Sequence, residues 1–354
     1  MSGKRTAFVT AGLAAGVVTG GVVARTVLRR RRLDPEAEEP LSLEPPEDLG
    51  FVESFDGTRI AVRAAGDPSA PILLFVHGFS LDMTIWHYQW TALSDRFRCV
   101  LFDLRSHGRS GPAASGDLSL AAMGHDVAAV LEAVVPGGRA VLVGHSLGGM
   151  AILSMAESRP DLFGERVAGA ALFGSSASDL LRDALGSVAG VLRPDLRTLR
   201  GAVRGLNRLR SYVLASPTDL GKVVVRVTQF GPDASPHLVG YVVGLAARAP
   251  SAVWTDGLVG LMDADLRHVA RHVRVPVLVA IGEHDRVTPP GSAAALADRL
   301  PDGRLEIIEG AGHMAMLERH ETVNEMLAAF AAGIAPHTAE VRPARRANAR
   351  RRPA

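Results

Sequence analysis

One serine lies in a setting that suits a nucleophile. The stretch Gly144–Gly149 reads GHSLGG, directly follows an apolar, β-branched run over residues 140–143, and precedes an amphipathic helical pattern. A Gly-x-Ser-x-Gly motif between a strand and a helix places the serine on a sharp, strained turn. Small residues are needed there because the strand and the helix pack closely, and the turn directs backbone N–H groups at whatever the serine attacks. We therefore predict that Ser146 attacks a carbonyl carbon.

A serine hydroxyl is a poor nucleophile and needs a general base, most often a histidine. The chain has twelve histidines. His313 stands out because it lies in the glycine-rich loop Gly310–Met314, directly after the last predicted strand and 28 residues after Asp285. The remaining histidines near motifs are expected to pack or to form hydrogen bonds: His77, His107, His145 and His284.

The elements that must position these residues alternate between short β-branched runs and helical patterns. The predicted strands are Phe51–Phe55, Arg59–Ala64, Ile72–Val76, Cys99–Asp103, Ala140–Gly144, Val167–Phe173, Pro276–Ile281 and Arg304–Ile308. Such runs are typical of parallel strands covered on both faces, and Asp56-Gly57 predicts a hairpin between the first two. An open α/β sheet of this kind places its site beyond the carboxyl ends of the strands. Residues 176–268 break the alternation and predict a helical cap over the site.

With these motifs, residues 50–334 resemble the α/β-hydrolase superfamily, in particular its esterase-like and lipase-like members with a GHSLGG elbow. The resemblance implies a mostly parallel eight-stranded sheet with helices on both faces and a helical cap. It also implies serine chemistry that needs no metal and no organic cofactor.

The resemblance further assigns the remaining members of a catalytic triad. The family's chain order is serine, acid, histidine, which corresponds here to Ser146, Asp285 and His313. The acid position falls on Asp285 within the stretch GEHDRVTP at 282–289. Glu283, two residues earlier, and Asp179, after the strand that ends at Phe173, are the alternative acids.

Two further motifs match the family. After His77-Gly78, the resemblance assigns one oxyanion-hole N–H to Phe79, and the residue after the nucleophile, Leu147, supplies the other. The stretch DLRSHGRS at 103–110 is close to the family's D-x-R-G-x-G-x-S and is expected to be structural. It departs from the pattern at Ser106, which stands in the place of a glycine.

These assignments predict a serine hydrolase that cleaves small carboxylic esters through an acyl-serine intermediate. The apolar-rich cap and the pair Trp86 and Trp90 favour apolar acyl groups of medium length. Thioesterase, lactonase, C–C hydrolase and cofactor-free perhydrolase chemistry remain open, as does a ligand sensor of slow turnover on the same fold.

The distribution of charge argues against a nucleic-acid partner. The chain has a net charge of +2 and a pI near 9.0, with 39 basic and 37 acidic residues. Seven of the basic residues lie in 1–33 and six in 336–354, where there is one acidic residue in total, so 34–335 carries 26 basic and 36 acidic residues, a net −10. The folded part therefore lacks the basic surface that a nucleic acid requires.

The N-terminal region reads as a membrane anchor with basic flanks, spanning 1–33. Thr6–Ala24 is uncharged, and as a helix it would measure about 28 Å, close to the thickness of the bilayer core. Five arginines follow the segment and a Lys-Arg pair precedes it, which favours a single-pass protein with its hydrolase domain on the cytoplasmic side. Export after signal-peptide cleavage is the alternative. Gly12, Gly16 and Gly20 form a stripe that would suit self-association.

The other regions follow from composition. Residues 34–48 are acidic and proline-rich, which predicts a stiff, extended linker. The hydrolase domain is expected to span 49–335, with its cap at about 176–268. A basic, disordered tail is expected over 336–354.

Overall fold

The computed structural model describes residues 34–135, 137–177, 220–262 and 265–334. The predicted anchor, its glycine stripe and the predicted C-terminal tail lie outside these ranges. No helix within them is long and apolar enough to cross a membrane.

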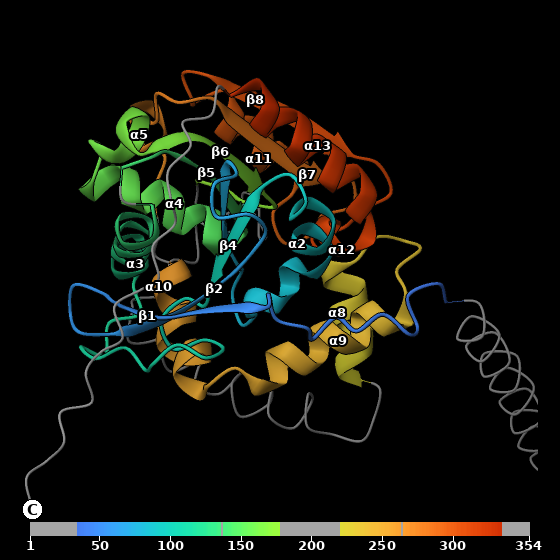
Figure 1. Cartoon of the computed structure of the whole chain (residues 1–354). Coiled ribbons are helices and arrows are strands. Elements are labelled where there is room, and N and C mark those ends of the chain that lie inside the picture. The colour runs from blue at the N-terminus through green and yellow to red at the C-terminus, as the bar shows by residue number, and fades with distance from the viewer. Residues whose placement is uncertain (1–33, 136, 178–219, 263–264, 335–354) are drawn as a thin grey trace, which may run out of the picture.

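A sheet of eight strands forms the centre of the molecule, in the order β1-β2-β4-β3-β5-β6-β7-β8 (Figure 1). The strands span Glu47–Glu53 (β1), Arg59–Ala65 (β2), Ile72–Val76 (β3), Arg98–Phe102 (β4), Ala140–His145 (β5), Val167–Phe173 (β6), Val277–Gly282 (β7) and Gly303–Ile308 (β8). β2 pairs antiparallel with both of its neighbours, and all pairs from β4 to β8 are parallel. The predicted mostly parallel eight-stranded sheet is therefore confirmed, including the hairpin between β1 and β2.

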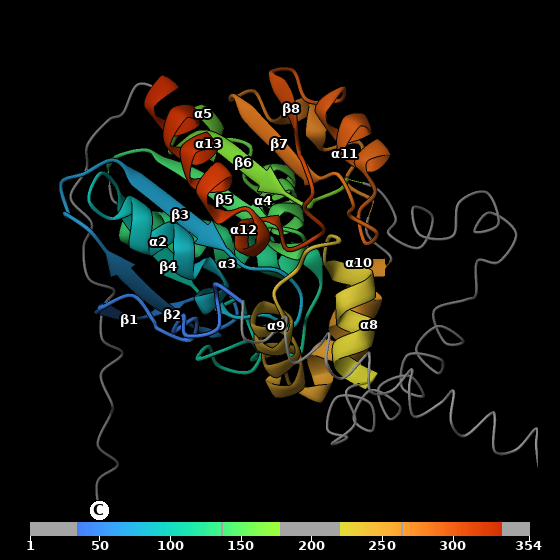
Figure 2. The same cartoon turned by 90° about the vertical axis from the view of Figure 1, so that its right-hand side faces the viewer.

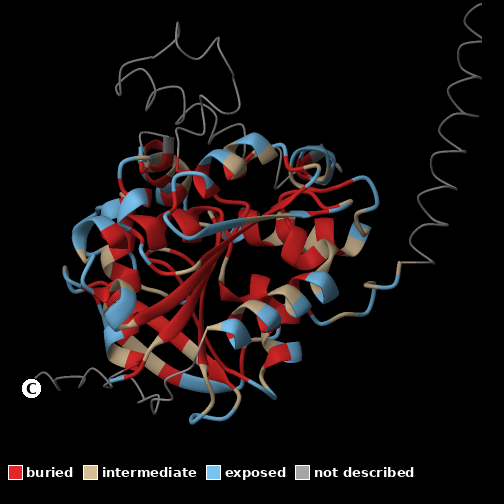
Figure 3. Ribbon diagram, turned by 90° about the horizontal axis from the view of Figure 1, so that it is seen from above, coloured by how far each residue is buried: buried red, intermediate tan, exposed pale blue. Residues whose placement is uncertain are grey.

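Helices cover both faces of the sheet (Figure 2). They are α2 (His87–Leu93), α3 (Leu120–Val134), α4 (Leu147–Ser158), α5 (Leu162–Glu165), α11 (Pro290–Ala297), α12 (Ala315–Glu318) and α13 (His320–Gly333), with short turns η1 (Met83–Trp86) and η4 (Ala270–His272). Alternate residues of a strand point to opposite faces. Accordingly, Leu74 packs in the cluster with α3 and α4, whereas its neighbours Leu73 and Phe75 pack with α2 and α13. The strands are buried almost throughout because both faces are covered (Figure 3).

The long insertion between β6 and β7 is helical where the structure describes it. It contains α8 (Leu220–Gln229), α9 (Pro236–Arg248), a π-helical turn η3 (Val253–Gly257) and α10 (Leu258–Met262). α8 and α9 pack against one another. This agrees with the helical character predicted for the cap, and the remainder of that range lies outside the described residues.

Residues 34–46, which we call the N-terminal strap, differ from the extended linker that their composition predicts. The Asp34 carboxylate accepts a hydrogen bond from the Ser235 hydroxyl at 2.8 Å, at the start of α9. Glu39 pairs with His87 of α2 at 2.6 Å, and Leu41 is only 2% exposed within the core. The prediction of a free spacer was wrong because these acidic side chains have partners on the folded domain, which composition does not reveal.

Candidate active site

Ser146 occupies a strained turn between β5 and α4. Its φ is +51°, a region that non-glycine residues rarely adopt, and its N–H donates to the Phe173 carbonyl at 2.8 Å. A Cβ at Gly148 would lie 2.2 Å from the Val76 carbonyl oxygen, and one at Gly144 would lie 2.6 Å from the Gly149 nitrogen. Glycine is therefore required at both positions of the motif, as the sequence predicts.

His313 and Asp285 meet at the carboxyl end of the sheet. The Nδ1 of His313 donates to Oδ2 of Asp285 at 2.7 Å, and both residues are about 95% buried. Because the carboxylate accepts at Nδ1, the Nε2 of the imidazole keeps its lone pair. β5 and β7 both flank β6, so Ser146 and Asp285 emerge at the same edge of the sheet.

A local network holds the Asp285 carboxylate in place. Its Oδ1 accepts the N–H groups of Val287 at 2.8 Å and Thr288 at 2.9 Å. The Thr288 hydroxyl lies 2.8 Å from Oδ2 and 2.9 Å from the Gly174 carbonyl, at the end of β6. Sequence reasoning missed Thr288, although its position three residues after the acid is the spacing at which a carboxylate binds a following backbone N–H.

The alternative acid Glu283 lies elsewhere. Its side chain is 51% exposed, and its carboxylate accepts the Gly310 N–H at 3.0 Å instead of contacting His313. Asp179, the other alternative, lies outside the described residues. Among the acids that the structure describes, the arrangement therefore favours Asp285.

Phe79 and Leu147 present the two backbone N–H groups expected to form an oxyanion hole. Neither donates to another group among the described residues. The next residue, Ser80, has a φ of +57°, and its N–H donates to Nε2 of His107 at 3.3 Å. Its neighbour His77 accepts the Leu104 N–H at 3.0 Å. These two histidines hold the loop after β3, as expected for residues with a packing and hydrogen-bonding role.

Burial keeps both of these histidines neutral. It lowers the pKa of His77 to about 4 and that of His107 to about 3. In each ring the other nitrogen donates to a backbone carbonyl, that of Gly78 for His77 and that of Arg105 for His107. Each neutral ring can therefore donate at one nitrogen and accept at the other.

The stretch 103–110 is a structural knot beside this loop. Asp103 accepts the N–H groups of Met83 and Arg109, each at 2.7 Å, and burial raises its pKa to about 7. Ser106 has a φ of +62°, so it adopts the left-handed conformation that the family's glycine adopts easily. A Cβ at Gly108 would lie 2.2 Å from the Asp103 carboxylate, so a side chain cannot fit at that position.

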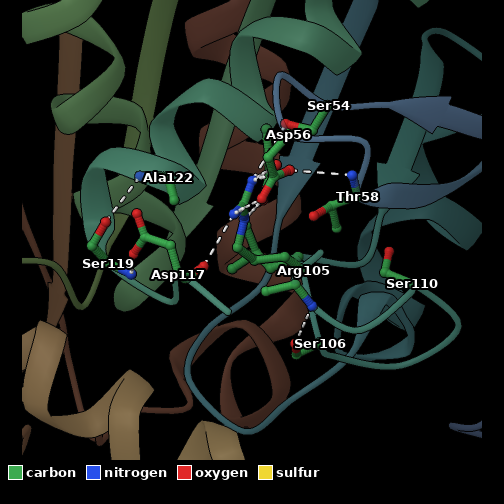
Figure 4. A network of polar contacts seen from close by, with 12 residues as sticks. Ser54, Asp56, Thr58, Arg105, Ser106, Ser110, Asp117, Ser119 and Ala122 are labelled. Carbon is green, nitrogen blue, oxygen red and sulfur yellow. Dashed lines mark hydrogen bonds and ion pairs between the residues drawn. The ribbon is translucent and has the colours of Figure 1, made fainter. Parts of the chain in front are cut away.

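Arg105 ties this knot to the first hairpin and to α3 (Figure 4). Its side chain is fully buried and makes two 2.7 Å bonds to the carboxylate of Asp126, which is also fully buried. A third contact reaches Asp56 of the β1–β2 turn at 3.1 Å. Bidentate geometry and complete burial make this the strongest ionic contact that we find in the described domain.

His145 connects the elbow to the loop that carries His313. Its Nε2 donates to the His313 carbonyl at 3.1 Å, and the two rings lie 4.8 Å apart. Burial, reinforced by the charge of His313, lowers the pKa of His145 well below its ordinary value. Its Nδ1 faces Gly78, where a Cβ would lie 2.6 Å away. The residue before the nucleophile therefore contacts both loops that complete the site.

The tryptophan pair does not form a substrate pocket. Trp86 is fully buried among Phe75, His145 and Phe173, and Trp90 packs against the same core cluster. A different tryptophan reaches the site: Trp254, on the π-helical turn of the cap, packs edge-on against Phe79 with ring centres 5.1 Å apart. Nothing in the local sequence distinguishes this cap residue from an ordinary core aromatic.

The described ranges contain no group of three His, Cys, Asp or Glu side chains that could hold a metal ion. The single cysteine, Cys99, is buried in β4.

Comparisons with known proteins agree with this geometry. A sequence model of the alpha/beta hydrolase family matches residues 73–326. The bifunctional esterase/perhydrolase DCH of Acinetobacter calcoaceticus is 29% identical over 80% of this chain and 99% of its own. The pimeloyl-[acyl-carrier protein] methyl ester esterase of Aeromonas hydrophila is 27% identical over 73% of this chain and 95% of its own. A thermophilic esterase from Thermogutta terrifontis has the same fold, with a TM-score of 0.65, 23% identity and coverage of 80% and 98% of the two chains.

Proposed function

Because the chain belongs to the α/β hydrolase family, we propose that it is a serine hydrolase that cleaves carboxylic esters with apolar acyl groups. The observation that carries the proposal is the buried 2.7 Å hydrogen bond between Asp285 and His313. It leaves the Nε2 of a neutral imidazole available as a base in a loop that His145 ties to the Ser146 turn.

The reaction would proceed in two stages. His313 accepts the hydroxyl proton as Ser146 attacks the ester carbonyl, and Asp285 stabilises the imidazolium that forms. The N–H groups of Phe79 and Leu147 donate to the developing oxyanion, where one such donor is typically worth about 3 kcal/mol. The imidazolium then protonates the leaving alcohol, and water activated by the same base releases the acid from the acyl-serine.

Turnover of p-nitrophenyl esters of increasing acyl length tests the proposal. We expect steady-state turnover by the wild type, with kcat/KM higher for medium chains than for acetate, since each buried methylene contributes about 0.8 kcal/mol. Ser146→Ala and His313→Ala should each abolish turnover, and the double variant should be scarcely worse because the residues act as a unit. No turnover above the Ser146→Ala background would refute ester hydrolysis.

A second acceptor is suggested by the Acinetobacter relative, which is a bifunctional esterase/perhydrolase. If hydrogen peroxide replaces water at the acyl-serine, the product is a peracid, so peracid formation in the presence of peroxide identifies this activity. A slow sensor would instead label with a fluorophosphonate at Ser146 and show a single burst without turnover.

We also propose that Thr6–Ala24 anchors the chain in a membrane, with the hydrolase domain on the cytoplasmic side. The uncharged length of the segment and the excess of arginines after it support this. Flotation of the full-length protein with vesicles tests it.

A further inference from the structure

The outer side of α8 exposes three valines in succession. Val223, Val224 and Val227 are 56%, 47% and 53% exposed, whereas Val225, on the other side of the helix, is buried. The three exposed valines fall within about 100° of the helix circumference and form one apolar stripe. Among the described residues only six large hydrophobic side chains are exposed, and a fourth, Leu43, lies on the strap. An apolar stripe of this kind marks a surface that meets a partner or a membrane.

α8 is joined directly to the loops of the candidate active site. The Gln229 carbonyl at its end accepts the Met314 N–H at 3.1 Å, one residue after His313. The Arg286 guanidinium, one residue after Asp285, donates to the Val227 carbonyl. The apolar stripe is therefore one helix away from the residues proposed to carry out the reaction.

The strap brings the N-terminal part of the chain to this same face. Asp34 is bound to Ser235 at the start of α9, which packs on α8. A cavity of about 790 Å³ lies between the strap and these two helices, with Leu41, Val223 and Val239 in its lining. In Figure 1 the strap crosses α8 and α9 on its way to the N-terminus.

This attachment shortens the connection to the predicted anchor. If residues 34–48 were an extended linker, the domain would be held well away from a membrane. Since the strap is bound from Asp34 onward, only residues 25–33 lie between Thr6–Ala24 and the α8–α9 face. Nine residues reach at most about 30 Å when fully extended. An anchored chain must therefore keep this face close to the lipid.

Charge at the face fits a phospholipid surface. Lys222 and Arg226 flank the valine stripe, and five arginines lie between residues 25 and 32. The strap carboxylates of Glu36 and Glu39 are directed at Tyr88 and His87 of the domain. Their charge is thus engaged by the protein and does not oppose lipid phosphates.

We propose that the valine stripe of α8 rests on the phospholipid bilayer that holds Thr6–Ala24, so that esters dissolved in the bilayer reach Ser146 from the lipid side. The second half of this statement rests on the proposed ester hydrolysis, and the first half does not. Lipid contact at α8 would place the apolar substrate beside the loops of His313 and Asp285 without passage through water.

A fluorophore placed on the stripe tests the contact with lipid. Val224→Cys can be labelled selectively in the full chain, because Cys99 is fully buried and burial raises the pKa of its thiol to about 12. Ile307→Cys is the matched control, since Ile307 is 43% exposed on β8, which both cartoon views place at the far end of the molecule from α8. Both variants are reconstituted in phosphatidylcholine vesicles.

We expect a spin-labelled lipid to remove at least half of the emission at position 224 and little at 307, with iodide showing the opposite order. Equal behaviour of the two labels would overturn the proposal, and so would failure of the full chain to float with vesicles.

The link to activity is tested by replacing all three valines with serine in the full chain. The variant should keep wild-type kcat/KM on a soluble ester, which also reports that it folds, and should lose at least tenfold on an ester dissolved in the vesicles. Undiminished activity on the vesicle ester would refute delivery from lipid. Absence of turnover by the wild type on either ester would instead refute the proposed function, while the labelling result would still decide the membrane contact.

Discussion

Replacing Asp285 by asparagine should remove almost all activity through the protonation state of His313. The Oδ1 of Asp285 accepts the N–H groups of Val287 and Thr288, so an asparagine must keep its carbonyl oxygen there. Its NH₂ group would then face Nδ1 of His313, which now lies 2.7 Å from Oδ2. An NH₂ group cannot accept, so the imidazole proton would move to Nε2, and no lone pair would remain for the Ser146 hydroxyl.

The magnitude follows from this change of tautomer. Loss of the correct tautomer in a Ser-His-Asp triad lowers kcat by about 10⁴, equivalent to about 5 kcal/mol of transition-state stabilisation. Substrate binding does not involve the buried carboxylate, so KM should change little. The assay is steady-state hydrolysis of a soluble p-nitrophenyl ester by purified variants, with circular dichroism to verify folding.

Glu283→Gln is the matched control, because it removes a neighbouring carboxylate that is 51% exposed and bonded to Gly310. It should retain activity within about twofold. The reasoning fails if Asp285→Asn stays within tenfold of the wild type. A loss of 10³ or more in Glu283→Gln, or in Asp179→Asn with Asp285→Asn active, would identify a different acid.

Three other outcomes follow from buried polar groups. Arg105→Ala should lower the free energy of unfolding in urea by about 3–5 kcal/mol, since Asp126 would remain buried without its cation; a loss below 1 kcal/mol would contradict this. His145→Phe should lower kcat about tenfold with KM unchanged, because the ring is kept and only the bond to the following catalytic loop is lost; His145→Gln, which keeps a donor, should recover part of the loss. The pKa of His107 is lowered to about 3 in the folded state, so the unfolded chain alone binds this proton as the pH falls from 6.5 toward 3, and stability is lost over that range. Urea unfolding at pH 7.5 and 4.5 should show the wild type losing about 2 kcal/mol more than His107→Gln, and equal losses would refute the assignment.

Local sequence was sufficient for the elbow and for the sheet. The glycines around Ser146 are demanded by backbone contacts within a few residues of the motif and with the adjoining strand, so the pattern carries the conformation with it. The strands could be located because a strand buried on both faces must be apolar along its whole length. Asp285 and His313 were placed by family order, and the structure brings them to 2.7 Å.

Contacts between distant segments could not be predicted in this way. The strap has a composition typical of a solvated linker, and only the positions of Ser235 and His87 on other elements turn its carboxylates into attachment points. Trp86 and Trp254 are both aromatic residues on helical segments, yet one is in the core and the other packs against Phe79, because the cap folds back from 175 residues further along the chain.

The sequence by itself therefore determined the chemistry and the scaffold, since nucleophile, turn and strands depend on short-range sterics and on the periodicity of burial. Only the tertiary structure decided which carboxylate faces His313, that His145 and Thr288 hold the acid and the base in place, and that the chain enters the domain beside the apolar stripe of α8. These features depend on the relative placement of elements far apart in the chain, and residue type carries no direct record of that placement.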